Sequence, residues 1–298
     1  MAVAGSAESM RSADSFLDTK VGDKTTSSEP EERWATVSGG RLRYLVQGSG
    51  APLVLLHGIV ASSFSFRLVS PQLSRDFRLC LPDLRVAAAD GSLLATASRI
   101  LQRLDREGIE SADILGSSHG GTVAMQLAVV APARVRRLIL VSPANPFARG
   151  YHRVVEFYLS GAGGILIRLA PFAPLPIWEY AIRRMCGPIT RLSADIGPGY
   201  RQPLREAGMT AHIRSSLKTF IADTEALRES LPHLSKIPTL LIWGDRDPVV
   251  ELDSARQLQQ ALGAEMAIMP GVGHLPYEES PEEFSRIVTK FLKNGVIG

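Results

Sequence analysis

The stretch 116–120, Gly-Ser-Ser-His-Gly, constrains the fold of this chain more than any other feature. The apolar run 112–115 before it predicts a buried strand, and residues 122–130 after it predict a helix. A tight turn between a strand and a helix strains its central residue, and flanking glycines relieve the crowding because they lack a Cβ atom. Ser118 would lie at that centre, beside helix N–H groups that stabilise negative charge. By itself the pattern also fits an ordinary glycine-rich turn.

Strands and helices alternate on both sides of this turn. A continuous apolar run, which is typical of buried parallel strands, lies at 52–56, and further strands are expected at 77–81, 137–141 and 238–243. A hairpin is expected over 36–47 and a last strand over 265–269, and helical spacing occurs at 93–107, 254–262 and 282–292. The alternation predicts an α/β fold with a mostly parallel, twisted sheet flanked by helices.

Between residues 144 and 232 this alternation stops. The segment is apolar, rich in proline and glycine, and helix-like near 154–158, 165–169, 177–185 and 217–230. It is too long for a simple connection, so we expect a helical lid inserted after the sixth strand. The predicted organisation is a disordered tail at 1–32, a core formed by 33–143 and 233–298, and a lid at 144–232.

Composition narrows the classes of partner. With 45% hydrophobic residues among 298, the chain can build a large core. The net charge of +3 is small and the basic residues are scattered, so we expect no nucleic-acid partner. The most apolar stretch, 157–178, is interrupted by Arg168 and three prolines, so we expect no stable membrane insertion.

The N-terminus and the cysteines bear on localisation. Residues 1–30 are rich in Ser, Ala, Asp, Glu, Lys and Thr and lack the apolar core of a secretory signal. Cys80 and Cys186 cannot form a disulfide framework, which fits a reducing compartment. We therefore expect a cytoplasmic protein.

Two loops late in the chain contain the side chains that a reactive serine needs. A serine hydroxyl is a weak nucleophile unless a base accepts its proton and an acid orients that base. Asp245 and Asp247 follow the strand at 238–243, and His274 follows the strand at 265–269. Catalytic groups collect at the carboxyl ends of such strands. The order serine, acid, histidine along the chain is that of one fold in particular.

From about residue 33 to its C-terminus, the chain resembles the α/β-hydrolase superfamily. The resemblance rests on His57-Gly58, on the 116–120 turn, on the loop 244–247 and on Gly273-His274. It implies that Ser118 is the nucleophile and His274 the general base. It also implies that Asp247 is the orienting carboxylate, because the family places this acid three residues after the glycine. Asp245 is the competing acid, and a capping role in its loop suits it better. The alternative acid position, at 142–145, holds no carboxylate.

The resemblance also implies an oxyanion hole. Its two donors would be the backbone N–H groups of His119 and Ile59, each worth roughly 3–4 kcal/mol in the transition state. We expect His57 to brace the oxyanion loop, and we assign His57, Phe147 and Trp178 to the substrate pocket. No cluster has metal-ligand spacing, so we expect neither metal nor cofactor.

One loop departs from the family pattern. Relatives commonly continue Pro-Asp-x-Arg with glycine and a small polar turn. Here residues 82–85 match, but Val-Ala-Ala-Ala follows at 86–89. Because this loop borders the active site in the family, access to the site is expected to differ.

The expected function is hydrolysis of an uncharged carboxylic ester through an acyl-enzyme, as in a carboxylesterase. The lid suggests this substrate because it is apolar and contains Phe147, Tyr151, Phe157, Tyr158, Phe172 and Trp178. The partners would be a small-molecule ester and water. The same triad also serves carbon–carbon, thioester and lactone hydrolases, and a non-catalytic ligand-binding protein on this fold is the alternative from another class. The oligomeric state and the substrate's identity stay open.

Overall fold

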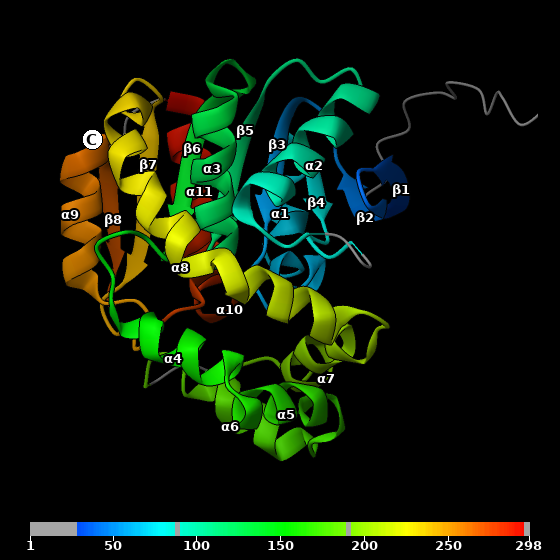
Figure 1. Cartoon of the computed structure of the whole chain (residues 1–298). Coiled ribbons are helices and arrows are strands. Elements are labelled where there is room, and N and C mark those ends of the chain that lie inside the picture. Colours follow the sequence, from blue (N-terminus) through cyan, green and yellow to red (C-terminus); the bar gives the residue numbers. More distant parts are fainter. Residues whose placement is uncertain (1–28, 87–89, 189–191, 295–298) are drawn as a thin grey trace, which may run out of the picture.

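An eight-stranded sheet forms the centre of the molecule (Figure 1). The computed structural model describes residues 29–86, 90–188 and 192–294. The strands are β1 (Glu31–Val37), β2 (Gly40–Gln47), β3 (Ala51–Leu56), β4 (Phe77–Pro82), β5 (Ala112–Ser117), β6 (Val135–Val141), β7 (Thr239–Gly244) and β8 (Glu265–Met269). Their order in the sheet is β1-β2-β4-β3-β5-β6-β7-β8. The β1–β2 and β2–β4 pairs are antiparallel and the other neighbouring pairs are parallel, which confirms the predicted sheet.

The first strand begins earlier than the sequence suggested. Glu31 and Glu32 belong to β1 and pair with Val46 and Leu45 of β2, although we expected a disordered tail up to residue 32. Backbone pairing in an antiparallel hairpin extends as far as the partner strand allows, whatever the polarity of the side chains. Residues 1–28 of the expected tail lie outside the described residues.

Helices cover both faces of the sheet (Figure 1). The helices of the core are α1 (Ser70–Leu73), α2 (Leu93–Arg106), α3 (His119–Val130), α9 (Leu252–Leu262), α10 (Pro276–Glu279) and α11 (Pro281–Asn294). The helices α2, α3 and α9 pack in one apolar cluster, and α1, α10 and α11 pack in the other. The apolar residues that α2 buries are Leu93, Ala97, Ile100 and Leu104, whereas Leu94 is exposed.

The helical insertion after the sixth strand is present. It contains α4 (Gly150–Leu159), α5 (Gly161–Leu169), the 3-10 turn η3 (Ala170–Phe172), α6 (Leu175–Arg183), α7 (Ile196–Arg201), the 3-10 turn η4 (Gln202–Arg205) and α8 (Met209–Leu234). The helices α4 to α7 lie together at one end of the sheet, and the long α8 leads back to β7 (Figure 1). We call the segment from α4 to α8 the lid. It covers the sheet end at which Ser118, Asp247 and His274 lie beyond their strands.

Candidate active site

Ser118 occupies a strained turn between β5 and α3. Its φ of +52° and ψ of −119° are unusual for a residue with a side chain. A Cβ atom on Gly116 would lie 2.3 Å from the carbonyl oxygen of Gly120, and one on Gly120 would lie 2.2 Å from that of Leu56. Both positions therefore require glycine, because β5, α3 and the end of β3 meet without room for a side chain. This packing holds the strained serine at the helix N-terminus.

The two downstream loops bring His274 and Asp247 together. The Nδ1 atom of His274 lies 2.9 Å from Oδ2 and 3.1 Å from Oδ1 of Asp247. A carboxylate only accepts hydrogen bonds, so we assign the ring proton to Nδ1, which leaves Nε2 as the basic nitrogen. Asp247 Oδ1 also accepts the N–H groups of Val249 and Val250, at 2.8 and 3.1 Å. These contacts orient the carboxylate towards His274.

Asp245 serves its own loop instead. Its Oδ1 atom accepts the backbone N–H of Gly271 at 2.7 Å, which ties the loop after β7 to the loop after β8. In the described structure no hydrogen bond or ion pair joins its side chain to His274, and Oδ1 lies 3.9 Å from Nε of Arg246. The geometry thus separates the two aspartates into a loop-capping residue and a histidine partner.

Glu279 is a supporting residue that the sequence did not single out. From α10, its carboxylate accepts the N–H groups of Gly273 at 2.9 Å and Leu275 at 3.1 Å, on either side of His274. It also accepts the N–H of Gly187, beyond the end of α6, at 2.7 Å. These bonds fix the backbone that carries His274. No sequence pattern points to them, because the contact with Gly187 spans 92 residues.

The loop after β3 approaches Ser118. A Cβ atom on Gly58 would lie 3.7 Å from the Cβ atom of Ser118, and the next residue, Ile59, lines the same cavity as the serine. His57 accepts the N–H of Leu84 at Nε2 (2.9 Å), so its Nδ1 carries a proton and donates to Gly58 O at 2.7 Å. Burial lowers the pKa of His57, which keeps it neutral. The ring braces this loop, as expected, rather than offering a base.

Residues just after β4 make further contacts around the loop that follows β3. Asp83 pairs with Arg43 at 2.6 Å and accepts the N–H of Ser63 at 2.7 Å. Arg85 donates to the carbonyl of Ala207 and pairs with Glu206, between η4 and α8 of the lid. Asp83 therefore ties two segments of the core together, and Arg85 connects the core to the lid. Val86 is buried, and residues 87–89 of the unusual loop lie outside the described residues.

Comparison with known proteins identifies the family. A sequence model described as the alpha/beta hydrolase fold matches residues 51–281. This chain belongs to the α/β-hydrolase family.

Relatives of this α/β-hydrolase differ in their named activities. A 2-hydroxymuconate semialdehyde hydrolase from Pseudomonas sp. strain CF600 is 30% identical over 261 residues, covering 82% of this chain and 88% of the relative. Lipase 1 of Psychrobacter immobilis is 24% identical, covering 83% and 78%. The structure of a thermophilic esterase from Thermogutta terrifontis superposes with a TM-score of 0.69 at 22% identity, covering 88% of this chain and 98% of the esterase. The last likeness shows the fold alone.

Ser118 faces an apolar cavity of about 350 Å³ between the core and the lid. Ile59 and His119 line it from the core, and Tyr151, Tyr158 and Trp178 line it from the lid. Further lining comes from side chains that sequence reasoning did not assign to a pocket: Ile213, Leu217 and Phe220 of α8, and Val249 and Val250 of the acid loop. The α8 residues follow helical spacing, which could have revealed the inward face. Among the described lining residues there is no Asp, Glu, Lys or Arg.

Several predicted pocket residues lie elsewhere. His57 is occupied by the loop it braces, and it does not line the cavity in the described structure. Phe147 packs against the core beside the guanidinium of Arg228, 5.0 Å from the ring centre, and is also absent from the lining. Of the three residues assigned to the pocket, only Trp178 lines the cavity. Among the other aromatic residues of the lid, Tyr151 and Tyr158 line it, whereas Phe157 and Phe172 are exposed.

Burial holds His57, His119 and His212 in the neutral form. Burial is the main cause that lowers the pKa of His119 to about 3, and the neighbouring His212 and His57 lower it further. Burial also lowers the pKa of His212 to about 4, with contributions from His57, Arg99 and Arg85. The Nδ1 atoms of His119 and His212 are buried without a hydrogen-bond partner in the described structure. His119 therefore offers the cavity a neutral ring, not a positive charge.

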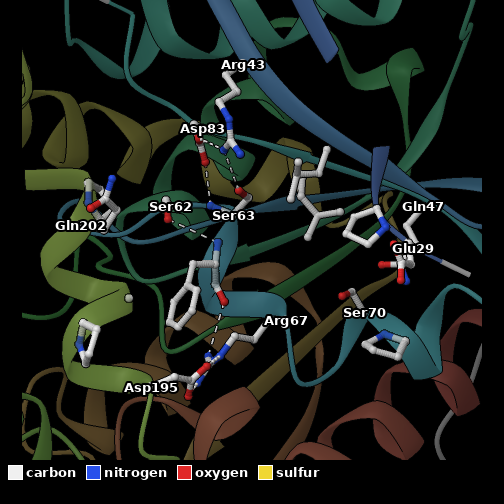
Figure 2. Close-up of a pocket in the computed structure, with 18 of the residues that line it drawn as sticks. Glu29, Arg43, Gln47, Ser62, Ser63, Arg67, Ser70, Asp83, Asp195 and Gln202 are labelled. Carbon is white, nitrogen blue, oxygen red and sulfur yellow. Dashed lines mark hydrogen bonds and ion pairs between the residues drawn. The ribbon is translucent and has the colours of Figure 1, made fainter. Parts of the chain in front are cut away.

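A second, larger cavity of about 880 Å³ lies on the other side of α7 (Figure 2). Its charged side chains already have partners: Arg43 pairs with Asp83, and Arg67 pairs with Asp195 and Glu278. Figure 2 shows Arg43 beside Asp83 and Arg67 beside Asp195. Neither Ser118 nor His274 lines it. Size alone would point to this cavity, but Ser118 lines the smaller one.

Proposed function

We propose that this α/β-hydrolase cleaves an uncharged carboxylic ester through an acyl-enzyme on Ser118. The observation that carries the proposal is the apolar, uncharged cavity that opens onto a serine held in a strained turn. An apolar cavity favours substrates whose acyl or alcohol part is uncharged, because a buried charge without a partner is costly.

The mechanism follows from the assigned groups. The Ser118 oxygen attacks the ester carbonyl while His274 Nε2 accepts its proton, and Asp247 stabilises the imidazolium that forms. The N–H groups of His119 and Ile59 would bind the oxyanion. The tetrahedral intermediate collapses, the alcohol leaves with the proton from His274, and water, activated by the same histidine, releases the acid and restores the serine.

The cavity favours an ester over the carbon–carbon substrates of some relatives. The substrate named for the Pseudomonas relative, 2-hydroxymuconate semialdehyde, is a carboxylate. A buried carboxylate requires a cation or several hydrogen-bond donors. The described lining of this cavity contains no Lys or Arg, and His119 is neutral. These observations support an uncharged substrate.

Hydrolysis of p-nitrophenyl esters from acetate to palmitate tests the proposal, with Ser118→Ala and His274→Ala as controls. We expect both variants to lose about a thousandfold or more in kcat. The best chain length would measure the cavity. If the wild type cleaves no ester but reacts with a fluorophosphonate, the serine is activated and the ester assignment is wrong; thioester, lactone and carbon–carbon substrates come next. With neither turnover nor labelling, a ligand-binding protein is the better description.

A further inference from the structure

The outer surface of the lid exposes a concentration of large apolar side chains. Eight of the thirteen exposed large hydrophobic residues in the described chain lie in α4, α5, η3 and α6. Six of them do not line the cavity, and we call them the lid apolar face: Phe157, Ile165, Leu169, Phe172, Ile177 and Tyr180. Phe172 is 78% exposed and Ile165 is 60% exposed. Apolar patches of this kind mark interaction surfaces in folded proteins.

Helix α5 shows that this exposure is patterned. Its exposed apolar residues 162, 165, 166 and 169 follow i, i+3, i+4, i+7 spacing, and Arg168 is exposed beside them. Its opposite face, Gly163, Gly164 and Ile167, is buried against the protein. An apolar stripe at this spacing normally faces a core. Here the buried face is made narrow by glycines and the apolar stripe faces outward.

The helices α4 and α5 are nearly as apolar as a membrane-spanning segment, but they do not form a single span. In the described chain no single helix is long and apolar enough to cross a bilayer. The helix α4 and residues Gly161–Phe172 pass the hydropathy test only when taken together, and they are bent by 83°. A bent apolar pair with a solvent-facing stripe is suited to lie on a surface.

Positive charge surrounds the apolar face. Residues 149–184 contain five arginines and two glutamates, a net charge of +3, whereas the whole chain is also +3. Arg153, Arg168, Arg183 and Arg184 are exposed, and in the described structure none of them has an ion-pair partner. Basic side chains beside inserted apolar residues strengthen binding to anionic lipid.

The face is continuous with the entrance to the cavity. Val154 and Leu166 are about half exposed and also line the cavity that contains Ser118. We propose that the lid apolar face docks onto the surface of a bilayer rich in anionic phospholipid, with its arginines at the headgroups. An apolar substrate dissolved in the bilayer would then enter the cavity between these two side chains. The docking itself does not depend on which bond the site cleaves.

Co-sedimentation with large unilamellar vesicles tests the docking. The vesicles contain phosphatidylcholine alone or phosphatidylcholine with 30% phosphatidylglycerol. The test variant combines Ile165→Ser, Leu169→Ser and Phe172→Ser. The matched control combines Leu94→Ser, Val130→Ser and Ile268→Ser, exposed apolar residues away from the lid. We expect the wild type to bind the anionic vesicles, the test variant at least tenfold more weakly, and the control like the wild type.

Further variants distinguish the effects of charge, of protein folding and of catalysis on vesicle binding. Arg153→Gln with Arg168→Gln should weaken binding to anionic vesicles several-fold, whereas Arg75→Gln with Arg106→Gln should not. Ser118→Ala should bind the vesicles like the wild type although it hydrolyses no ester. Vesicle binding can therefore be judged independently of catalysis. Thermal unfolding of each variant checks that it is folded. Absence of vesicle binding by the wild type, or equal binding by the lid variant, overturns the proposal. A concentration-dependent dimer lost in the lid variant, without vesicle binding, assigns the face to a second copy and also overturns it.

Discussion

The carboxylate of Asp247 lies 2.9 Å from Nδ1 of His274, across two loops that follow the neighbouring strands β7 and β8. The loops touch so closely that a Cβ atom on Gly244 would lie 2.2 Å from the carbonyl oxygen of Val272. Asp245, two residues earlier, is turned to Gly271 instead. This division of roles between two aspartates in one loop leads to the first prediction.

Asp247→Asn should lower kcat for ester hydrolysis by about 10³- to 10⁴-fold, because the amide no longer holds the histidine in its productive tautomer. Asp245→Asn is the matched control, and it should retain kcat within about threefold. Steady-state kinetics on a p-nitrophenyl ester measure both. If Asp245→Asn is the more damaging change, the acid has been assigned to the wrong aspartate.

Glu279→Gln should lower kcat by about ten- to a hundredfold with little change in KM, because small displacements of a reacting group are costly to catalysis. The glutamate positions His274 through backbone contacts and does not contact the cavity in the described structure. Glu282→Gln, an exposed change on the same stretch of chain, serves as the control. Equal activity of the two variants would show that the His274 loop holds its shape without this carboxylate.

Gly120→Ala should destabilise the protein by about 2 kcal/mol or more, because the new methyl group meets the backbone of β3 and not a movable side chain. Gly161→Ala is the contrasting change. A Cβ atom there has no neighbour within 4 Å, and alanine favours the helix that begins at this residue. Urea unfolding monitored by circular dichroism compares the two. Similar stability of both variants would mean that the turn adjusts more freely than the packing indicates.

Acid should unfold this protein partly through its buried histidines. The folded-state pKa values of His119 and His212, about 3 and about 4, lie below the unfolded value of 6.5, so unfolding takes up protons below that pH. Their contribution to stability is complete above pH 6.5 and is lost progressively as pH falls towards the folded values. At pH 5 each of these two histidines should lower the free energy of unfolding by roughly 2 kcal/mol.

The variant His119→Gln with His212→Gln checks this contribution. Urea unfolding between pH 7.5 and pH 5 should show a smaller loss of stability in the variant than in the wild type, by about 4 kcal/mol. An unchanged pH dependence would place the acid sensitivity in other groups.

Much of the architecture could be predicted from local patterns. Buried parallel strands are continuous apolar runs, and the turn around Ser118 combines strand, glycines and helix within 20 residues. Because the carboxyl ends of parallel strands share one edge of the sheet, the loops with Asp247 and His274 could be expected near that serine. The helical lid followed from the length and composition of one segment.

The amino-acid sequence by itself determined the alternation of strands and helices, the strained serine turn and the loops that contain the acid and the histidine. Only the tertiary structure decided which side chains face the cavity, because adjacent residues of one helix point in different directions: in α6, Ile177 is exposed and Trp178 lines the cavity. It also decided the role of Glu279, whose contact with Gly187 is made between segments far apart in the chain. Local periodicity fixes what each element is, whereas the packing of distant elements fixes what each side chain meets.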